Sequence, residues 1–370
     1  MPAFCDRDTL DWLLASDEPA ARLVALTYLL DRPGDDPEVR AAHGAVLADA
    51  GTRDLTNRLG DWDHPVPLSG HNSPAYAPNL LGLLADMGLE RGDDPVVDAA
   101  VSAMLHHQDE SGRLTSPGVI ARISPEPILS ALQCDSHAIC EVLIRFGQAE
   151  HPVVRRALDR MAADLAVTPQ GSGWPCLPSY GFRGPGRRSD VCPQVTLEAV
   201  RTLARLPADR RPIDPARLLA AARTTLRVWS ERGTGKPYMF GHGLGFKTVK
   251  WPPFWYGVLG VLDTVGRYPE LWRGSAARPE DRSAIAELVA CLRAYNLDST
   301  GRVTPRSCYR GFEAFSFGQK KRPSPFATAR VLAVLRPFED LADAVASLDV
   351  MALGSSKGGS GTAIGPRVPR

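Results

Sequence analysis

The sequence predicts an all-α protein in which pairs of helices close into a ring. An apolar helical pattern introduced by proline recurs at intervals of about 60 residues, which indicates an internal structural repeat. Segments with strand character are nearly absent, and short turns such as residues 31–37 favour antiparallel helix pairs. A second set of helical segments is apolar on nearly every face, as is typical of buried helices. Together these observations predict six inner and six outer helices.

The outer helices are expected to begin at prolines that mostly follow a capping residue. A side-chain acceptor at this place satisfies free backbone N–H groups, and proline at the first helical position loses no hydrogen bond. The predicted starts are Asp36-Pro37, Asp94-Pro95, His151-Pro152, Asp214-Pro215 and Pro279, and residues 339–351 supply the sixth outer helix.

The inner helices are expected just before those starts. Their segments are residues 20–30, 74–89, 131–147, 192–206, 253–267 and 325–336. Helix pairs of this kind stack into an open solenoid or a closed ring. Because an open solenoid leaves its concave face in water, six uniformly apolar inner helices favour the ring, in which the two ends of the chain meet.

Composition sets the broad class of protein. The chain has 43 Lys or Arg and 42 Asp or Glu, giving a net charge of +1, and 44% hydrophobic residues. These values exclude disorder of the whole chain and the strongly basic balance of many nucleic-acid-binding proteins. We find no apolar run long enough for a membrane span and no export signal at the start, so we expect a cytoplasmic protein with one domain over residues 1–353. Residues 354–370 are rich in Gly and Ser and are predicted to form a flexible tail.

Four long loops begin with variants of the pattern Q-x-x-x-G-x-W. They lie at Asn57–Trp62, Gln108–Leu114, Gln170–Trp174 and Asn296–Val303. These turns resemble the QW repeats of the terpenoid cyclase and protein prenyltransferase superfamily, and the sequence looks most like bacterial prenyltransferase or squalene oxidase repeat proteins. The resemblance covers about residues 10–350 and implies an α/α toroid of six inner and six outer helices. The Asp-x-Asp-Asp motif of class II cyclases is absent, and residues 61–64 come nearest to it.

Cysteines gather near one rim of the expected ring. Seven cysteines in a chain without an export signal are better explained as thiols or metal ligands than as disulfides. Cys134, Cys176 and Cys192 belong to adjacent repeats, and His137 shares a helix face with Cys134. This set can form a tetrahedral zinc site, with His137, Cys140, His242 or water as the fourth ligand. The alternative is that small buried thiols meet there by chance.

The same rim is basic and aromatic. The loops 171–190, 232–252 and 301–322 carry thirteen Lys or Arg against two acidic residues, and more than half of the aromatic side chains lie in nearly the same stretches. A basic mouth over an aromatic interior suits an apolar molecule with an anionic head, such as an isoprenoid diphosphate. The expected ligand-binding residues are Arg183, Arg187, Arg188, Lys247, Lys250, Trp251, Trp255, Lys320 and Lys321.

Three functions remain open from the sequence. In the first, the ring is a transferase or cyclase acting on an isoprenoid-like substrate, with Asp190 or His242 as the general acid or base. In the second, a non-catalytic scaffold binds nucleic acid or a protein partner through its basic rim. In the third, an interaction module has a central space filled by Trp251, Phe254 and Trp255.

Overall fold

The computed structural model describes residues 3–62, 72–118, 126, 128–177, 189–234, 237, 240–350 and 353. It is 55% helical and 7% strand, which confirms the predicted all-α class. None of the helices in these ranges combines the length and apolar character needed to cross a lipid bilayer.

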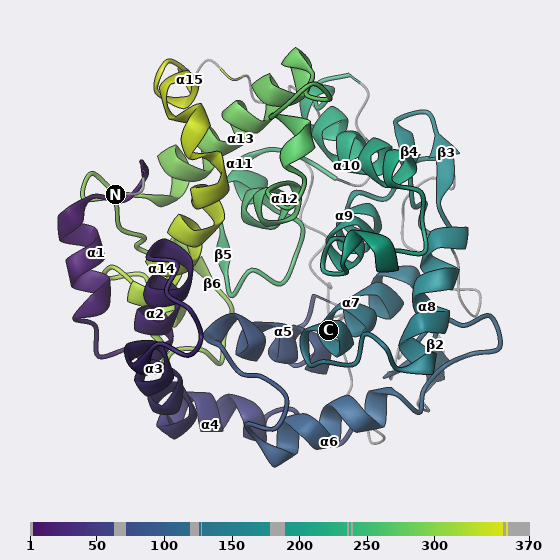
Figure 1. Cartoon of the computed structure of the whole chain (residues 1–370), viewed down its shortest axis with the longest axis horizontal. Coiled ribbons are helices and arrows are strands. Elements are labelled where there is room, and N and C mark those ends of the chain that lie inside the picture. Colours follow the sequence, from purple (N-terminus) through teal and green to yellow (C-terminus); the bar gives the residue numbers. More distant parts are fainter. Residues whose placement is uncertain are drawn as a thin grey trace, which may run out of the picture.

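Six helical segments surround the centre of the molecule (Figure 1). They are α2 (Pro19–Val24) with its π-helical continuation η1 (Ala25–Leu29), α5 (Ala77–Met87), α7 (Gln133–Arg145), α9 (Pro193–Ala204), α12 (Val258–Val265) and α14 (Pro325–Leu335). Each contacts the next in chain order, and α14 contacts α2, so the contacts form a closed circuit. All six lie at the positions that the sequence predicts for inner helices.

A second set of helices lies outside this circuit (Figure 1). It comprises α3 (Pro37–Ala48), α6 (Pro95–Met104), α8 (Pro152–Ala163), α10 (Pro215–Ser230), α13 (Pro279–Asn296) and, after the 3-10 segment η5 (Arg336–Leu341), α15 (Ala342–Ala346). The inner helices α2, α7, α9 and α12 each contact the outer helix that follows them. Shorter elements are α1 (Arg7–Leu14), α4 (Ala50–Asn57), α11 (Leu244–Lys247) and the 3-10 turns η2 (Ala208–Arg210), η3 (Pro269–Leu271) and η4 (Ser316–Gly318).

The predicted capping residues begin the outer helices as expected. Asp94 accepts hydrogen bonds from the backbone N–H groups of Val96 and Val97, and Asp214 caps α10 in the same way. Asp36 and His151 each accept one such bond, whereas α13 begins at Pro279 without a side-chain cap. Local chemistry therefore determines where most outer helices begin.

Strand is confined to three short pairs in the described residues. The antiparallel pairs are β1 (Ser116–Gly118) with β2 (Ile128–Ser130) and β3 (Ala166–Thr168) with β4 (Gly171–Gly173). The parallel pair joins β5 (Lys250–Trp251) to β6 (Ser307–Cys308), with Lys250 opposite Ser307. This last pair brings the loops of the fifth and sixth repeats together.

Polar contacts join the first repeat to the last. One carboxylate oxygen of Glu18 accepts hydrogen bonds from Ser316 Oγ at 2.7 Å and from the Phe326 N–H at 3.0 Å. Thr9 Oγ1 donates to the Thr300 carbonyl at 2.9 Å. The first and last repeats of the helical array are therefore in contact.

Hydrogen bonds join the repeated loop turns to an outer helix. Gln108 Nε2 donates to the Gly112 carbonyl at 2.9 Å and to the Val153 carbonyl, at the start of α8, at 2.8 Å. Gly112 has a φ of +92° and lies against Arg156, so its lack of a side chain serves both the turn and the close approach. In a second turn, Trp174 Nε1 donates to the Met161 carbonyl at 2.8 Å.

Candidate functional site

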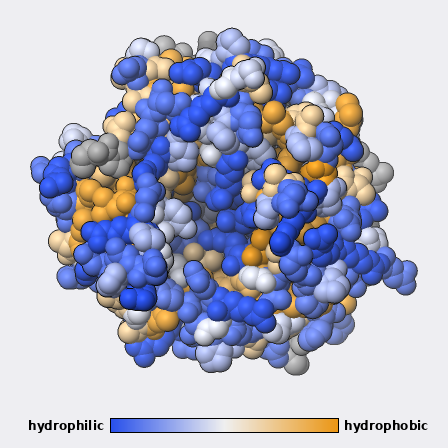
Figure 2. Space-filling view, in the orientation of Figure 1, coloured by the Kyte–Doolittle hydropathy of each residue, from blue (hydrophilic) through white to orange (hydrophobic). Residues whose placement is uncertain are grey.

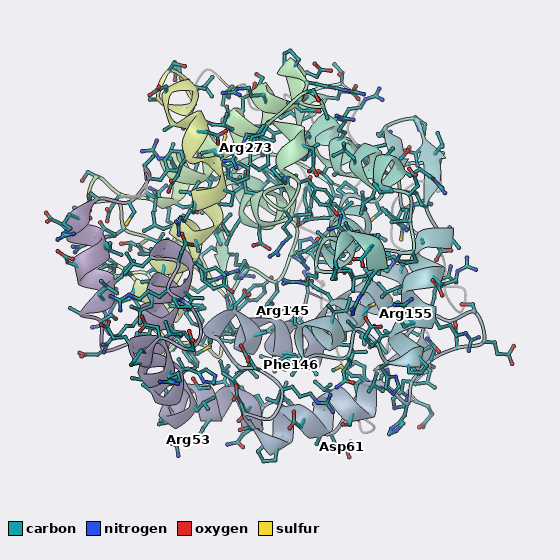
Figure 3. The ribbon with its side chains drawn as sticks, viewed as in Figure 1. Arg53, Asp61, Arg145, Phe146, Arg155 and Arg273 are labelled. Atoms are coloured by element: carbon teal, nitrogen blue, oxygen red, sulfur yellow. The ribbon has the colours of Figure 1, made fainter. Side chains whose placement is uncertain are left out.

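A cavity of about 110 Å³ lies between the inner helices. Helices α5, α7, α9, α12 and α14 line it together with the loop residues 252–255. Figure 2 shows a hollow at the centre of the face in view, lined by hydrophilic residues, and Arg145 lies beside this hollow in Figure 3. The inner helices are therefore not apolar on every side, because each of these five turns at least one charged side chain to the cavity. These are Asp86, Glu141, Arg145, Glu198, Arg201, Arg205, Asp263 and Arg330.

Glu141 of α7 is held between Arg201 of α9 and Arg205, the residue that directly follows this helix. Arg201 Nη2 lies 2.6 Å from one carboxylate oxygen, and Arg205 Nη2 lies 2.7 Å from the other. The Nε atom of each arginine also donates to the same oxygen as its Nη2, at 2.7 Å and 2.8 Å. Burial alone would raise the pKa of Glu141, but the guanidinium groups of Arg201, Arg205 and Arg145 lower it to about 2. Glu141 is therefore ionised at neutral pH.

A second ion-pair group joins α5, α7 and α14. Asp86 Oδ1 lies 2.7 Å from Arg145 Nη2, and its Oδ2 lies 3.1 Å from Arg330 Nη2. Asp263 of α12 pairs with Arg267, whose Nη2 lies 3.4 Å from Asp263 Oδ1. Although burial opposes ionisation, Arg267, Arg330 and the two arginines that pair with Glu141 hold the pKa of Asp263 well below its usual range. Both carboxylates thus have cationic neighbours.

Glu198 of α9 is in a different environment from these three acids. Its side chain is buried, with the residue only 5% exposed. One oxygen accepts a hydrogen bond from Gln194 Nε2, whereas Oε2 has no hydrogen-bond partner within the described part of the chain. Burial raises the pKa of Glu198 to about 8. At neutral pH this carboxyl group is therefore mainly protonated.

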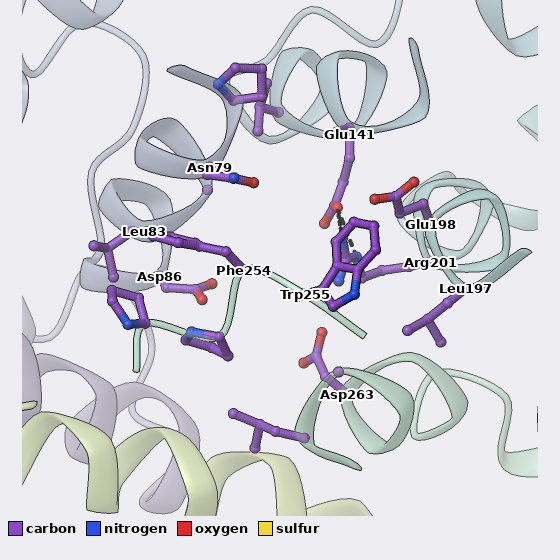
Figure 4. A pocket seen from close by; sticks show the side chains of 18 of the residues that line it. Asn79, Leu83, Asp86, Glu141, Leu197, Glu198, Arg201, Phe254, Trp255 and Asp263 are labelled. Atoms are coloured by element: carbon purple, nitrogen blue, oxygen red, sulfur yellow. Dashed lines mark hydrogen bonds and ion pairs between the residues drawn. The ribbon is translucent and has the colours of Figure 1, made fainter. Parts of the chain in front are cut away.

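Figure 4 shows how these groups meet in the cavity. The side chains of Glu141 and Glu198 converge from neighbouring helices, and Trp255 and Phe254 lie beside them. Phe254 packs against Tyr309, with ring centroids 5.5 Å apart, and the Trp255 ring is stacked on Phe240. The loop at residues 252–255 thus supplies an aromatic wall that contacts the sixth repeat.

The cysteines predicted to form a metal site lie near one another. The pKa of Cys134 is raised well above its usual value by burial and, to a smaller extent, by the neighbouring acidic groups of Asp135, Glu198, Cys192 and Cys176. Burial, followed by Cys176 and Glu198, raises the pKa of Cys192 to about 12. Cys176 is partly exposed. Within the described ranges no group of three or more His, Cys, Asp or Glu side chains is arranged to hold a metal ion, so zinc binding stays a prediction.

His137 is directed toward the backbone of α9. Its Nδ1 lies 3.3 Å from the Val195 carbonyl oxygen, and its ring stands edge-on to Trp174 with centroids 6.3 Å apart. Burial lowers the pKa of His137 to about 4, so this imidazole is neutral at physiological pH. Cys140, considered as another ligand, is fully buried in the core.

Asp190 and His242, the predicted acid–base residues, are not among the residues that line the central cavity. Asp190 is buried and accepts a hydrogen bond from Ser189 Oγ at 3.4 Å. His242 is buried beside Trp229 and Phe246, with Nε2 3.0 Å from Tyr256 Oη. Their catalytic role stays a prediction.

Of the predicted ligand-binding residues that the structure describes, Trp255 lines the cavity. Lys247 is buried with Nζ 5.2 Å from the Tyr295 ring centre, and Lys250 Nζ lies 3.6 Å over Tyr309. Trp251 is buried and packs against Phe317. Lys320 and Lys321 are exposed, and Arg183, Arg187 and Arg188 lie outside the described residues. Several basic and aromatic residues of this rim thus pack against other side chains.

No protein-family model, curated protein or solved structure matches this chain.

Proposed function

We propose that this chain is an α/α toroid whose central cavity is an acid–base site, in which Glu198 exchanges a proton with a small bound molecule. The toroid is supported by the closed circuit of inner-helix contacts and by the hydrogen bonds between the first and last repeats. The repeated glycine turns agree with the resemblance to the terpenoid cyclase and prenyltransferase superfamily. Because one fold serves many functions, the functional part of the proposal depends on the cavity alone.

The observation that carries the proposal is the second oxygen of Glu198. A buried polar atom without a partner costs about 1–3 kcal/mol, so such atoms call for an explanation. Glu198 Oε2 is buried in the wall of a cavity, and Gln194 Oε1 beside it also has no partner among the described residues. A ligand that accepts a hydrogen bond from the protonated Glu198 carboxyl group would give Glu198 Oε2 a partner.

The chemistry of Glu198 fits general acid–base catalysis. A catalytic acid is most effective when its pKa lies near the working pH, and burial brings the pKa of Glu198 to about 8. Glu141 cannot serve in this way because its two arginines keep it ionised. Two carboxyl groups in one cavity therefore have opposite protonation states, as is common in acid–base sites.

The size of the cavity limits the substrate. Sites for drug-sized molecules usually enclose roughly 300–1,000 Å³. The cavity here has about 110 Å³, so it favours a molecule much smaller than an isoprenoid diphosphate. We therefore propose an enzyme that acts on a small substrate with apolar contacts to Trp255, Phe254 and the leucines of α5, α9 and α12.

Filling the cavity tests this proposal. Gly82 lines the cavity, and a Cβ atom at this position would meet no atom within 4 Å, so Gly82→Leu should occupy the space without a clash at Cβ. Gly44→Leu on the outer helix α3 is a matched control, since Gly44 is exposed and has equal room. A library of small molecules is screened by thermal shift. We expect ligands that stabilise the parent and Gly44→Leu but not Gly82→Leu.

Proton transfer is tested with the same ligands. Each cavity ligand is incubated with the parent and followed by NMR for chemical change. We expect conversion of at least one compound, with a loss of about 10²–10⁴-fold in Glu198→Gln. The proposal is overturned if every ligand binds Gly82→Leu as well as the parent, or if Glu198→Gln converts the compound at the parental rate.

A further inference from the structure

We infer that the molecule bound in the central cavity is a small monocarboxylate with an apolar body, whose negative charge is held by the cavity arginines while Glu198 donates a hydrogen bond to it. This inference rests on the proposed function and names its substrate class. The supporting observations are the charge balance of the cavity, the free edges of its arginines and the apolar character of its remaining wall.

The charges that line the cavity do not balance. Arg145, Arg201, Arg205 and Arg330 supply four positive charges to the lining. Asp86, Glu141 and Asp263 have cationic neighbours and supply three negative charges. Glu198 is neutral when protonated, so the residues of the lining carry one positive charge in excess, and Arg267, which pairs with Asp263 from outside the lining, adds to this excess. An anion bound among these arginines would therefore offset the excess positive charge of the lining.

The guanidinium groups of the cavity arginines also have N–H donors that the ion pairs do not use. Arg201 and Arg205 each direct Nε and Nη2 to Glu141. Their Nη1 atoms have no hydrogen-bond partner among the described residues, and both arginines line the cavity. Arg330 uses only Nη2, on Asp86. A guanidinium group presents five N–H donors, and carboxylates are the anions that fit its planar geometry best.

The rest of the wall suits a short apolar body. Leu83, Leu197 and Leu259 line the cavity from three helices, and Phe254 and Trp255 cover it from the loop. A neutral carboxyl group such as that of Glu198 can donate a hydrogen bond to a carboxylate oxygen, which an ionised one cannot do. A small volume with one cationic end therefore favours short monocarboxylates over diphosphates.

Because the inference depends on the neutral form of Glu198, every charged neighbour of this group matters. Asp135 and Glu141 face it from α7 and favour its protonated form, whereas Arg201 on its own helix favours ionisation. The thiols of Cys134 and Cys192 and the phenol of Tyr76 are also electrostatic neighbours, and burial raises the pKa of each of them. They are therefore uncharged at neutral pH and do not alter the balance.

The test uses three probes of equal length and different charge: propionate, propionamide and propylamine. Binding is measured by isothermal titration calorimetry at pH 7 and pH 9 and at matched ionic strength. At pH 7 the parent should bind propionate at least tenfold more tightly than the other two. At pH 9 propionate binding should weaken about tenfold, since most of Glu198 is then ionised.

Three variants complete the test. Glu198→Gln stays neutral, so its propionate affinity should be the same at pH 7 and pH 9, and Gly82→Leu should lose binding while Gly44→Leu retains it. If propionamide or propylamine binds the parent as tightly as propionate and Gly82→Leu loses it, the monocarboxylate inference is wrong and the cavity site stands. If all three probes bind Gly82→Leu and the parent alike, both the inference and the proposed function fail.

Discussion

Replacing Glu198 by glutamine should make the protein more stable at pH 8 and leave its stability nearly unchanged at pH 5. Burial raises the pKa of Glu198 from 4.5 to about 8 in the folded state. Between these two pH values the folded protein binds more protons at Glu198 than the unfolded chain does. The contribution of Glu198 to the free energy of unfolding is therefore most favourable below pH 4.5 and falls as the pH rises toward 8. Each pH unit in this window costs about 1.4 kcal/mol, which gives about 3–4 kcal/mol between pH 5 and pH 8. Glutamine keeps the acceptor for Gln194 and does not titrate.

The measurement is urea denaturation of the parent and of Glu198→Gln at pH 5, 6, 7 and 8. Subtracting the two unfolding free energies removes the pH dependence of all other groups. The difference should grow steadily in favour of the variant by about 3–4 kcal/mol, a large part of a typical stability of about 5–15 kcal/mol. Gly44→Ala, which changes no titratable group, should show a difference that does not vary with pH. A flat or inverted difference for Glu198→Gln would refute a neutral, buried carboxyl group.

Four other outcomes are expected, three of them from urea denaturation at pH 7. Glu141→Gln should lose about 3–5 kcal/mol because it leaves two cavity arginines without their shared carboxylate, and a loss below about 1 kcal/mol would contradict the ion-pair description. Gly44→Ala should gain about 0.5–1 kcal/mol, since the new methyl group meets no atom within 4 Å, and a loss would be unexpected. Gly88→Ala should lose more than about 1 kcal/mol, because φ is +107° and the added Cβ would overlap the side chain of Leu23. Ellman's reagent at pH 8 should react rapidly with no more than two of the seven native thiols, Cys176 and Cys308, because the other five are buried, and fast reaction of three or more would count against the packing.

The helical organisation could be predicted because its signals are local. Proline is favoured at the first position of a helix, and an Asp or His directly before it can cap the free N–H groups. The capping residues in the structure are Asp36, Asp94, His151 and Asp214. The inner helices could be located from their apolar character, although five of them also turn charged side chains to the central cavity. Helix α4 was not predicted, although Asp49 caps it by accepting a hydrogen bond from the Thr52 N–H.

The cavity residues were missed because they lie in segments that are otherwise apolar. Glu198, Arg201 and Arg205 are spaced so that they share one face of α9, and Glu141 and Arg145 share a face of α7. Charged residues at helical spacing within a buried helix are the signal that could have located the site. The protonation states could not be predicted, because they depend on Glu141 taking both Arg201 and Arg205 and leaving Glu198 without one.

The basic and aromatic loops led the sequence prediction to the rim rather than to the cavity. In the structure Lys250 lies over Tyr309, and Trp251 packs against Phe317. Long loops that cover a ring of helices need large apolar side chains to hold them in place, and lysines gain from lying on aromatic faces. Sequence alone does not distinguish such packing from ligand binding.

The measurement that tests the account most directly is the pKa of Glu198 itself. Protein labelled with ¹³C at glutamate side-chain carboxyl groups is titrated by NMR from pH 4 to pH 9, and the Glu198 signal is assigned by its absence from Glu198→Gln. We predict a carboxyl group that is still protonated at pH 7 and titrates at about pH 8. Titration near the ordinary glutamate value of about 4.3 would contradict the central claim, because the cavity would then hold no neutral acid and no excess positive charge.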